Sequence, residues 1–163
     1  MRPILTLLFA FITLTASAQS SADSTPAQKH PTLPAMEILS LDSTTRTNTF
    51  TFEEGRPTLI FLFSPDCDHC GMDADTLIGF MRQRPNLRVI AVSFAPLAQI
   101  RSFAKDHHFE GTPNLTYGKD PYTFVPRFYG VQYFPFFALY NKDKKLVQTW
   151  DGGVKWDTLR RLL

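Results

Sequence analysis

Cysteine is scarce in this chain of 163 residues, which has only Cys67 and Cys70. Two cysteines at that spacing exclude a framework of distant disulfide staples, and a bridge between them closes too short a loop to stabilise much. Long basic runs are also lacking and the formal net charge is +2, so no nucleic-acid partner is indicated. The two cysteines are therefore better explained by chemistry than by stabilisation.

The composition favours one folded domain preceded by an export signal. Hydrophobic residues make up 44% and aromatic residues 13% of the chain, which argues against disorder. Residues 1–18 match a cleavable signal peptide, with one positive charge at Arg2, an apolar run over 4–14 and small residues up to Ala18. That run is shorter than the ~20 residues of a membrane-spanning helix. Cleavage after Ala18 is therefore favoured over a retained anchor.

Export places the rest of the chain in a periplasmic or other extracytoplasmic, oxidising compartment. No cysteine stands at the cleavage site, so a lipid anchor is disfavoured. Residues 19–34 are polar and contain three prolines, which predicts a flexible tether. Residues 35–163 are left as the folded domain.

Within that domain the apolar pattern predicts an α/β fold. Short strands at 36–41 and 47–52 are expected to form a hairpin-like addition to a larger sheet. A buried strand at 58–63, a helix that ends near Pro85, a strand at 87–94 and a helix that begins near Pro96 then give the order β-α-β-α, typical of parallel strands with right-handed crossovers. The remaining elements expected are strands at 114–117, 134–140 and 146–150 and helices at 126–129 and 155–163.

The cysteines stand where the buried strand gives way to the helix. A Pro65-Asp66 break follows the strand, and Cys67 comes directly after it. At a helix start the unpaired backbone N–H groups and the helix dipole favour a thiolate over a thiol. Cys67 is thus the expected attacking sulfur, and Cys70 is placed on the same face to resolve a mixed disulfide.

This arrangement resembles the thioredoxin superfamily, and more narrowly the exported TlpA-like thiol-disulfide oxidoreductases. The resemblance rests on the segment 63–70 and on Tyr129-Gly130-Val131 ahead of Pro135 on an apolar strand, and it covers about residues 35–163. It implies a thioredoxin-like fold, a central mixed sheet flanked by helices with extra N-terminal strands.

The resemblance also implies roles for four residues. Cys67 matches the nucleophilic cysteine, Cys70 the resolving cysteine and Pro135 the cis-proline that faces the disulfide, while Phe134 offers its backbone to extended substrate peptides. The sequence departs from the family where Asp66 replaces a common tryptophan. Phe136 replaces a common threonine, and the strand at 59–63 lacks the buried acid that often assists proton transfer.

Three charged or titratable residues beside the cysteines are candidates for redox tuning. His69, drawn toward the thiolate, would stabilise the reduced form, whereas Asp66 and Asp68 would oppose it. Helix capping is an equally good explanation for the two carboxylates. His107 and His108 fall near the end of the second helix, where a solvated surface role is expected rather than metal ligation.

The expected function is an exported thiol-disulfide oxidoreductase that acts on exported cysteine-containing proteins and needs no cofactor. As implied by TlpA-like relatives, it reduces disulfides with electrons from a membrane partner. The alternative is a copper-binding metallochaperone of the same fold, with Cys67, Cys70 and His69 as soft ligands. A peroxiredoxin-type peroxidase is disfavoured because Pro57 and Thr58 lie too far from Cys67. Aromatic side chains at Tyr133, Phe134 and Phe136 are expected either to bind peptide substrates or to pack in the core.

Overall fold

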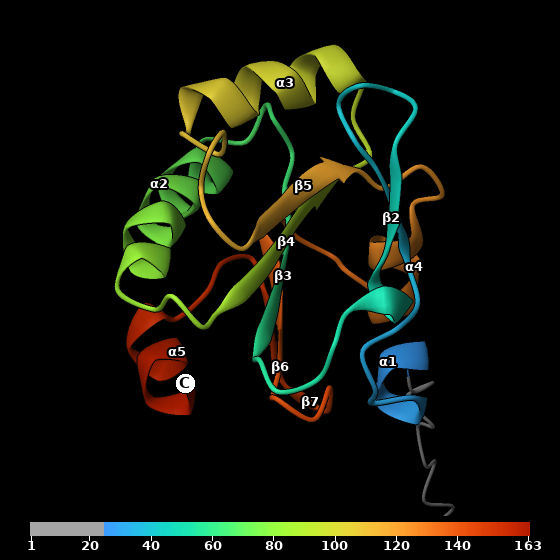
Figure 1. The fold of residues 1–163 in the computed structure, drawn as a ribbon, viewed down its shortest axis with the longest axis vertical. Coiled ribbons are helices and arrows are strands. Elements are labelled where there is room, and N and C mark those ends of the chain that lie inside the picture. Colours follow the sequence, from blue (N-terminus) through green and yellow to red (C-terminus); the bar gives the residue numbers. More distant parts are fainter. Residues whose placement is uncertain (1–24) are drawn as a thin grey trace, which may run out of the picture.

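The computed structural model describes residues 25–163, so the predicted signal peptide and the first residues of the predicted tether lie outside the described part. One mixed sheet of seven strands forms the centre, with helices on both faces (Figure 1). The strand order is β2-β1-β5-β4-β3-β6-β7. The α/β class and the central mixed sheet predicted from the sequence are confirmed.

The sheet combines a parallel core with antiparallel edges. β3, β4 and β5 run parallel to one another, β6 pairs antiparallel with β3, and β7 pairs antiparallel with β6. β1 and β2 form the predicted N-terminal hairpin, which joins the sheet through β1 and β5. The strands are Glu37–Leu39 (β1), Arg46–Asn48 (β2), Thr58–Leu62 (β3), Arg88–Ser93 (β4), Leu115–Lys119 (β5), Phe136–Tyr140 (β6) and Leu146–Asp151 (β7).

A glycine allows the hairpin to join the sheet. A Cβ atom on Gly118 in β5 would stand 2.3 Å from the carbonyl oxygen of Leu39 in β1. Only a residue without a side chain permits that approach.

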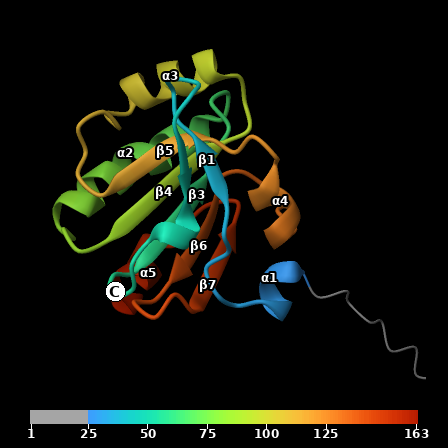
Figure 2. The same ribbon diagram turned by 45° about the vertical axis from the view of Figure 1, so that its right-hand side comes forward.

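The helices divide between the two faces of the sheet, as Figures 1 and 2 show. α2, α3 and α5 cover one face and contribute to one apolar cluster, while α1 and α4 cover the other face and contribute to a second cluster. The helices are Pro26–Lys29 (α1), Asp68–Arg82 (α2), Leu97–Asp106 (α3), Phe124–Tyr129 (α4) and Trp156–Leu162 (α5). No helix among residues 25–163 is long and apolar enough to cross a bilayer.

β3 lies inside the sheet between β4 and β6, and every residue in it is buried. Leu59, Phe61 and the following Phe63 face the α2 side, whereas Ile60 and Leu62 face the α4 side. Burial on both faces explains the continuous apolar run, which differs from the alternation of a half-exposed strand. The buried strand therefore fixes the point at which the cysteine segment leaves the sheet.

Two segments differ from the predictions. The strand predicted over 47–52 ends at Asn48, because the Asn48 side chain accepts the Phe50 N–H and the chain turns into a 3-10 helix, Thr49–Thr51. The Thr49 hydroxyl, which accepts the Met36 N–H, is buried there. Residues 25–34, predicted as part of the tether, instead contain α1, and its Ala27 packs in the second apolar cluster.

Candidate active site

The two cysteines lie at the start of α2, just beyond the C-terminal end of β3. Cys67 is the N-cap residue of the helix, and its Sγ accepts the backbone N–H of Cys70 at 3.3 Å. The predicted helix-start environment of Cys67 is thus present as a specific hydrogen bond. An N–H donor pointing at sulfur stabilises the thiolate form.

The two sulfurs differ in exposure. Both are free thiols, with Cys67 partly exposed and Cys70 fully buried. Burial raises the pKa of the Cys70 thiol well above its ordinary value, and the neighbouring Cys67 raises it further. The Cys67 sulfur is therefore the more accessible of the two, and the Cys70 thiol is the harder one to deprotonate.

The three predicted tuning residues are all exposed, but they do not share one location. Asp68 occupies the first helical position and lines a pocket together with Cys67. His69 lies close enough to Asp73 for its charge to lower the pKa of that carboxyl. Neither Asp66 nor Asp68 caps the helix, because Cys67 does.

Asp73 is a site residue that the sequence reasoning missed. Its Oδ1 accepts the indole N–H of Trp156 at 3.1 Å. Burial raises the pKa of the Asp73 carboxyl above its ordinary value, although the hydrogen bonds from Trp156 and from the Val154 backbone oppose the shift. Its charge also contributes to the raised pKa of Cys70. The carboxylate missing from β3 thus has a counterpart on α2.

Phe134 and Pro135 lie beside the cysteine segment. Their peptide bond is cis. The antiparallel register pairs Leu62 with Phe136, and its continuation sets Pro135 next to Phe63 on the path to Cys67. Pro135 is buried and Phe134 is half-buried. The predicted pair is thus brought to the end of the sheet that carries the cysteines.

A second carboxylate holds the loop that precedes this proline. The two oxygens of Asp151, at the end of β7, accept the backbone N–H groups of Gln132 at 2.9 Å and Tyr133 at 2.8 Å. Asp151 was not predicted, since it lies sixteen residues from Pro135 along the chain and carries no local motif. The structure brings it there through the β6–β7 pairing.

The aromatic residues near Pro135 have different environments. Tyr133 is 69% exposed, whereas Phe136 is buried in the second apolar cluster. Phe134 lies with its ring centroid 5.9 Å from that of Phe94, which is itself 41% exposed. Core packing is therefore confirmed for Phe136, whereas peptide binding by Tyr133 and Phe134 stays a prediction.

A pocket of about 280 Å³ opens beside Cys67. His107 lines its far side, and the His107 Nδ1–H donates to Asp75 Oδ1 at 2.8 Å. The His107 side chain is only 21% exposed, so the solvated role expected for it is wrong. The reason is tertiary: the end of α3 packs on α2, and the imidazole contacts the Phe103 ring in a tilted arrangement with centroids 4.3 Å apart. The pocket is lined by Pro65, Cys67, Asp68, Gly71, Met72, Asp75, Phe103 and His107.

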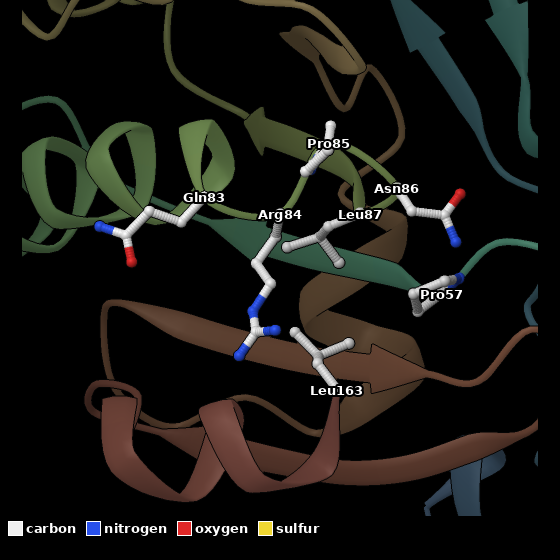
Figure 3. A pocket seen from close by; sticks show the side chains of 7 residues that line it. All are labelled: Pro57, Gln83, Arg84, Pro85, Asn86, Leu87 and Leu163. Atoms are coloured by element: carbon white, nitrogen blue, oxygen red, sulfur yellow. The ribbon is translucent and has the colours of Figure 1, made fainter.

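Another pocket, of about 250 Å³, lies at the opposite end of β3 (Figure 3). It extends from Pro57 through residues 83–87 to Leu163, and the Arg84 side chain reaches from the end of α2 toward α5. Neither cysteine lines it, so it is separate from the site described here.

The donor groups offer no ready metal centre. Within residues 25–163 no group of three or more histidine, cysteine, aspartate or glutamate side chains is arranged to hold a metal ion. His69, the third ligand considered for copper, is exposed and lies near Asp73.

Comparison with protein-family models and with curated protein sequences finds no match. Solved structures do match. A thioredoxin candidate of Neisseria meningitidis shares 22% identity at a TM-score of 0.65, over 86% of this chain and 88% of its own. A secreted disulfide oxidoreductase of Mycobacterium tuberculosis shares 17% sequence identity at a TM-score of 0.63, and the match covers 77% of this chain and 91% of that one. The thioredoxin domain of a Bacteroides vulgatus thiol-disulfide oxidoreductase shares 15% sequence identity at a TM-score of 0.65, and the match covers 80% of this chain and 94% of that one.

These similarities show that the chain has a thioredoxin-like fold. At such identities they do not carry the activities of those proteins to this one. Activity depends on the residues of a site and not on the fold alone.

Proposed function

We propose that the protein is an exported thiol-disulfide oxidoreductase of the TlpA-like type. The observation that carries the proposal is the asymmetry of the two sulfurs at the start of α2. Cys67 is partly exposed and accepts the Cys70 N–H, while Cys70 is buried with a raised pKa. A nucleophile and a resolving thiol need that difference in access and ionisation.

The reaction proceeds by two thiolate attacks. The Cys67 thiolate attacks a substrate disulfide, forming a mixed disulfide and releasing one substrate sulfur. Cys70 then attacks the Cys67 sulfur, which releases the second substrate sulfur and leaves Cys67 and Cys70 joined. Asp73, close to Cys70 and with a raised pKa, takes the proton that Cys70 gives up.

Phe134 and Pro135 supply the binding surface for the substrate chain. Asp151 fixes the loop ahead of them through two backbone hydrogen bonds. The exposed Tyr133 and the Phe94–Phe134 pair give this surface an apolar character. An extended, cysteine-containing protein segment suits such a surface better than a small polar disulfide.

The charges around Cys67 favour the reductive direction. Asp68 shares the pocket with Cys67, and Asp66 precedes it, whereas the charge of His69 acts on Asp73. Negative charge destabilises the thiolate and so favours the disulfide form of the protein. A couple that prefers to be oxidised gives its electrons to the substrate.

Compartment and partners follow from the N-terminal sequence. Residues 1–18 supply a cleavable signal and direct the domain to the periplasm or an equivalent exported location. The substrates are exported proteins with cysteines, and a membrane protein returns the electrons that each cycle consumes. No cofactor takes part.

The decisive test is to trap the mixed disulfide. In a Cys70→Ser variant the resolving sulfur is gone, so exported proteins are expected to remain attached to Cys67 and to be released by a reducing agent. A Cys67→Ser variant is the matched control, since it leaves only the buried thiol. A Cys70→Ser protein that captures no more than this control would disprove the exchange mechanism.

A further inference from the structure

Cys67, Gly71 and Asp75 lie in one row along α2, four residues apart, and the His107 imidazole rests across the middle of that row. Its Nδ1 is bound to Asp75. A Cβ built on Gly71 would stand 3.1 Å from Nε2 but 4.0 Å from Nδ1. The free nitrogen, Nε2, therefore lies closer to Gly71 than Nδ1 does, and Cys67 lines the same pocket as the ring.

Gly71 explains how the ring reaches this position. Glycine is unfavourable inside a helix, so an interior glycine calls for a packing reason. That same Cβ would approach the ring Cε1 to 2.9 Å, closer than packed atoms allow. Gly79, on the same helix, has open space at the corresponding position. The first glycine makes room for the imidazole and the second does not.

We propose that His107 is the proton acceptor and donor for Cys67, acting across their shared pocket, with Asp75 as its positioning residue. The inference rests on the proposed function and extends it. The pocket that both residues line, about 280 Å³, has room for water molecules, and a proton can pass between the two groups through water. A nucleophile, a base and a carboxylate that orients the base form the usual set of an activated cysteine.

The step balances as follows. The Cys67 S–H proton passes to Nε2, and the thiolate attacks the substrate disulfide, so that one S–S bond forms and one breaks. The leaving substrate thiolate takes the proton back from Nε2. In the second attack the Cys70 proton passes through Asp73 to the other substrate sulfur. The protein loses two electrons and two protons, and the substrate disulfide gains them.

The charges facing His107 come from both packed helices. On α2 these are Asp75, which binds it, and Asp68, which lines the same pocket. Asp106, at the end of α3, and Arg82, on α2, line an adjoining pocket on the far side of Asp75. The imidazolium is thus balanced by Asp75, and its formation adds no net positive charge that would oppose the reductive direction.

The test is the pH dependence of Cys67 alkylation by iodoacetamide in a Cys70→Ser chain, where Cys67 is the only thiol. We expect His107→Gln to slow alkylation about tenfold at neutral pH and to leave it within about twofold at strongly alkaline pH, where the thiol ionises unaided. The alkylation rate of Asp75→Asn at neutral pH is expected to lie between those of His107→Gln and the parent. His108→Asn is the matched control, because it removes the neighbouring histidine.

Gly71→Ala provides a second route that keeps every titratable group. Its Cβ displaces the ring, so the same loss at neutral pH is expected, while Gly79→Ala has no effect. Unchanged alkylation in both His107→Gln and Gly71→Ala would overturn the proposal. Because alkylation needs no disulfide substrate, this result is independent of the trapping experiment, and either proposal can fail while the other stands.

Discussion

The indole N–H of Trp156 donates to the Asp73 carboxylate at 3.1 Å, joining the last helix to the first turns of the cysteine helix. Trp156 also packs against Phe80 in a tilted arrangement and against Phe137 edge to face, so the indole is held by the core. A carboxylate fixed by a core residue has a defined position next to Cys70. That bond connects the packing of α5 to the proton chemistry proposed for the resolving thiol.

Asp73→Asn is expected to slow the resolving step. The amide still accepts the Trp156 N–H but cannot take the Cys70 proton, so we expect resolution to slow about tenfold or more. The mixed disulfide should then accumulate in the otherwise intact protein, as measured by quenched-flow alkylation and mass spectrometry. Asp143→Asn, which changes an exposed carboxylate in the β6–β7 turn, is the control. Equal resolution rates in the parent and Asp73→Asn would remove Asp73 from the mechanism.

The same residue gives a prediction for stability against pH. Burial raises the pKa of Asp73 in the folded state above the ordinary value of 3.8, so the folded protein binds this proton more tightly than the unfolded chain does. Its ionised form therefore costs stability, a cost that grows as pH rises from 3.8 through the raised folded value. We expect Asp73→Asn to melt at or above the parent temperature at neutral pH, and this advantage to disappear near pH 3.8. A lower melting temperature at neutral pH would show that the hydrogen bond outweighs desolvation.

Asp151→Ala is expected to weaken the binding of protein substrates selectively. Two N–H groups of the loop before Pro135 lose a charged acceptor, so the loop is no longer held in place. We expect KM for a protein disulfide to rise about fivefold or more, because each hydrogen bond to a charged group is worth about 1.5–3 kcal/mol. Reduction of a small aromatic disulfide serves as the internal reference. The control Asp143→Ala, in the exposed β6–β7 turn, should change neither the KM for the protein disulfide nor the reduction of the small disulfide. An equal loss of activity of Asp151→Ala on both substrates would indicate general unfolding instead.

Asp120 is expected to be a stability residue rather than a functional one. Its buried carboxylate accepts the backbone N–H groups of Tyr122, Phe124 and Val125 and so fixes the start of α4. Replacing it by alanine leaves buried donors unpaired, which should lower the free energy of unfolding by about 2–4 kcal/mol. Chemical denaturation measures this loss. The alkylation rate of Cys67 should be unchanged, because α4 lies on the other face of the sheet.

The sequence predicts the elements with strong periodicity and clear breaks. The apolar run of β3, the stripe on α2 and the Pro65-Asp66 break locate Cys67 and Cys70 correctly, because local pattern decides those features. The strand predicted over 47–52 is wrong beyond Asn48. Alternating polarity predicts a strand there, but the hydrogen bonds of Asn48 and Thr49 turn the chain. Local side-chain bonds of this kind override periodicity.

The supporting residues of the site are harder to predict. Asp73 had a local signal, because a residue three places after Cys70 lies on the same helix face. His107 and Asp151 had none: each reaches the site through the packing of α3 on α2 or the pairing of β6 with β7. A single sequence specifies such contacts only through the complete fold.

The central claim is that Cys67 and Cys70 form a reversible couple poised for reduction, and equilibrium titration of the parent protein against glutathione tests it most directly. We predict one two-electron transition with a potential near that of thioredoxin, about −270 mV. A couple near about −120 mV, as in a strong oxidant, would contradict the reductive direction. A protein whose two thiols form no reversible disulfide at all would contradict the exchange mechanism itself.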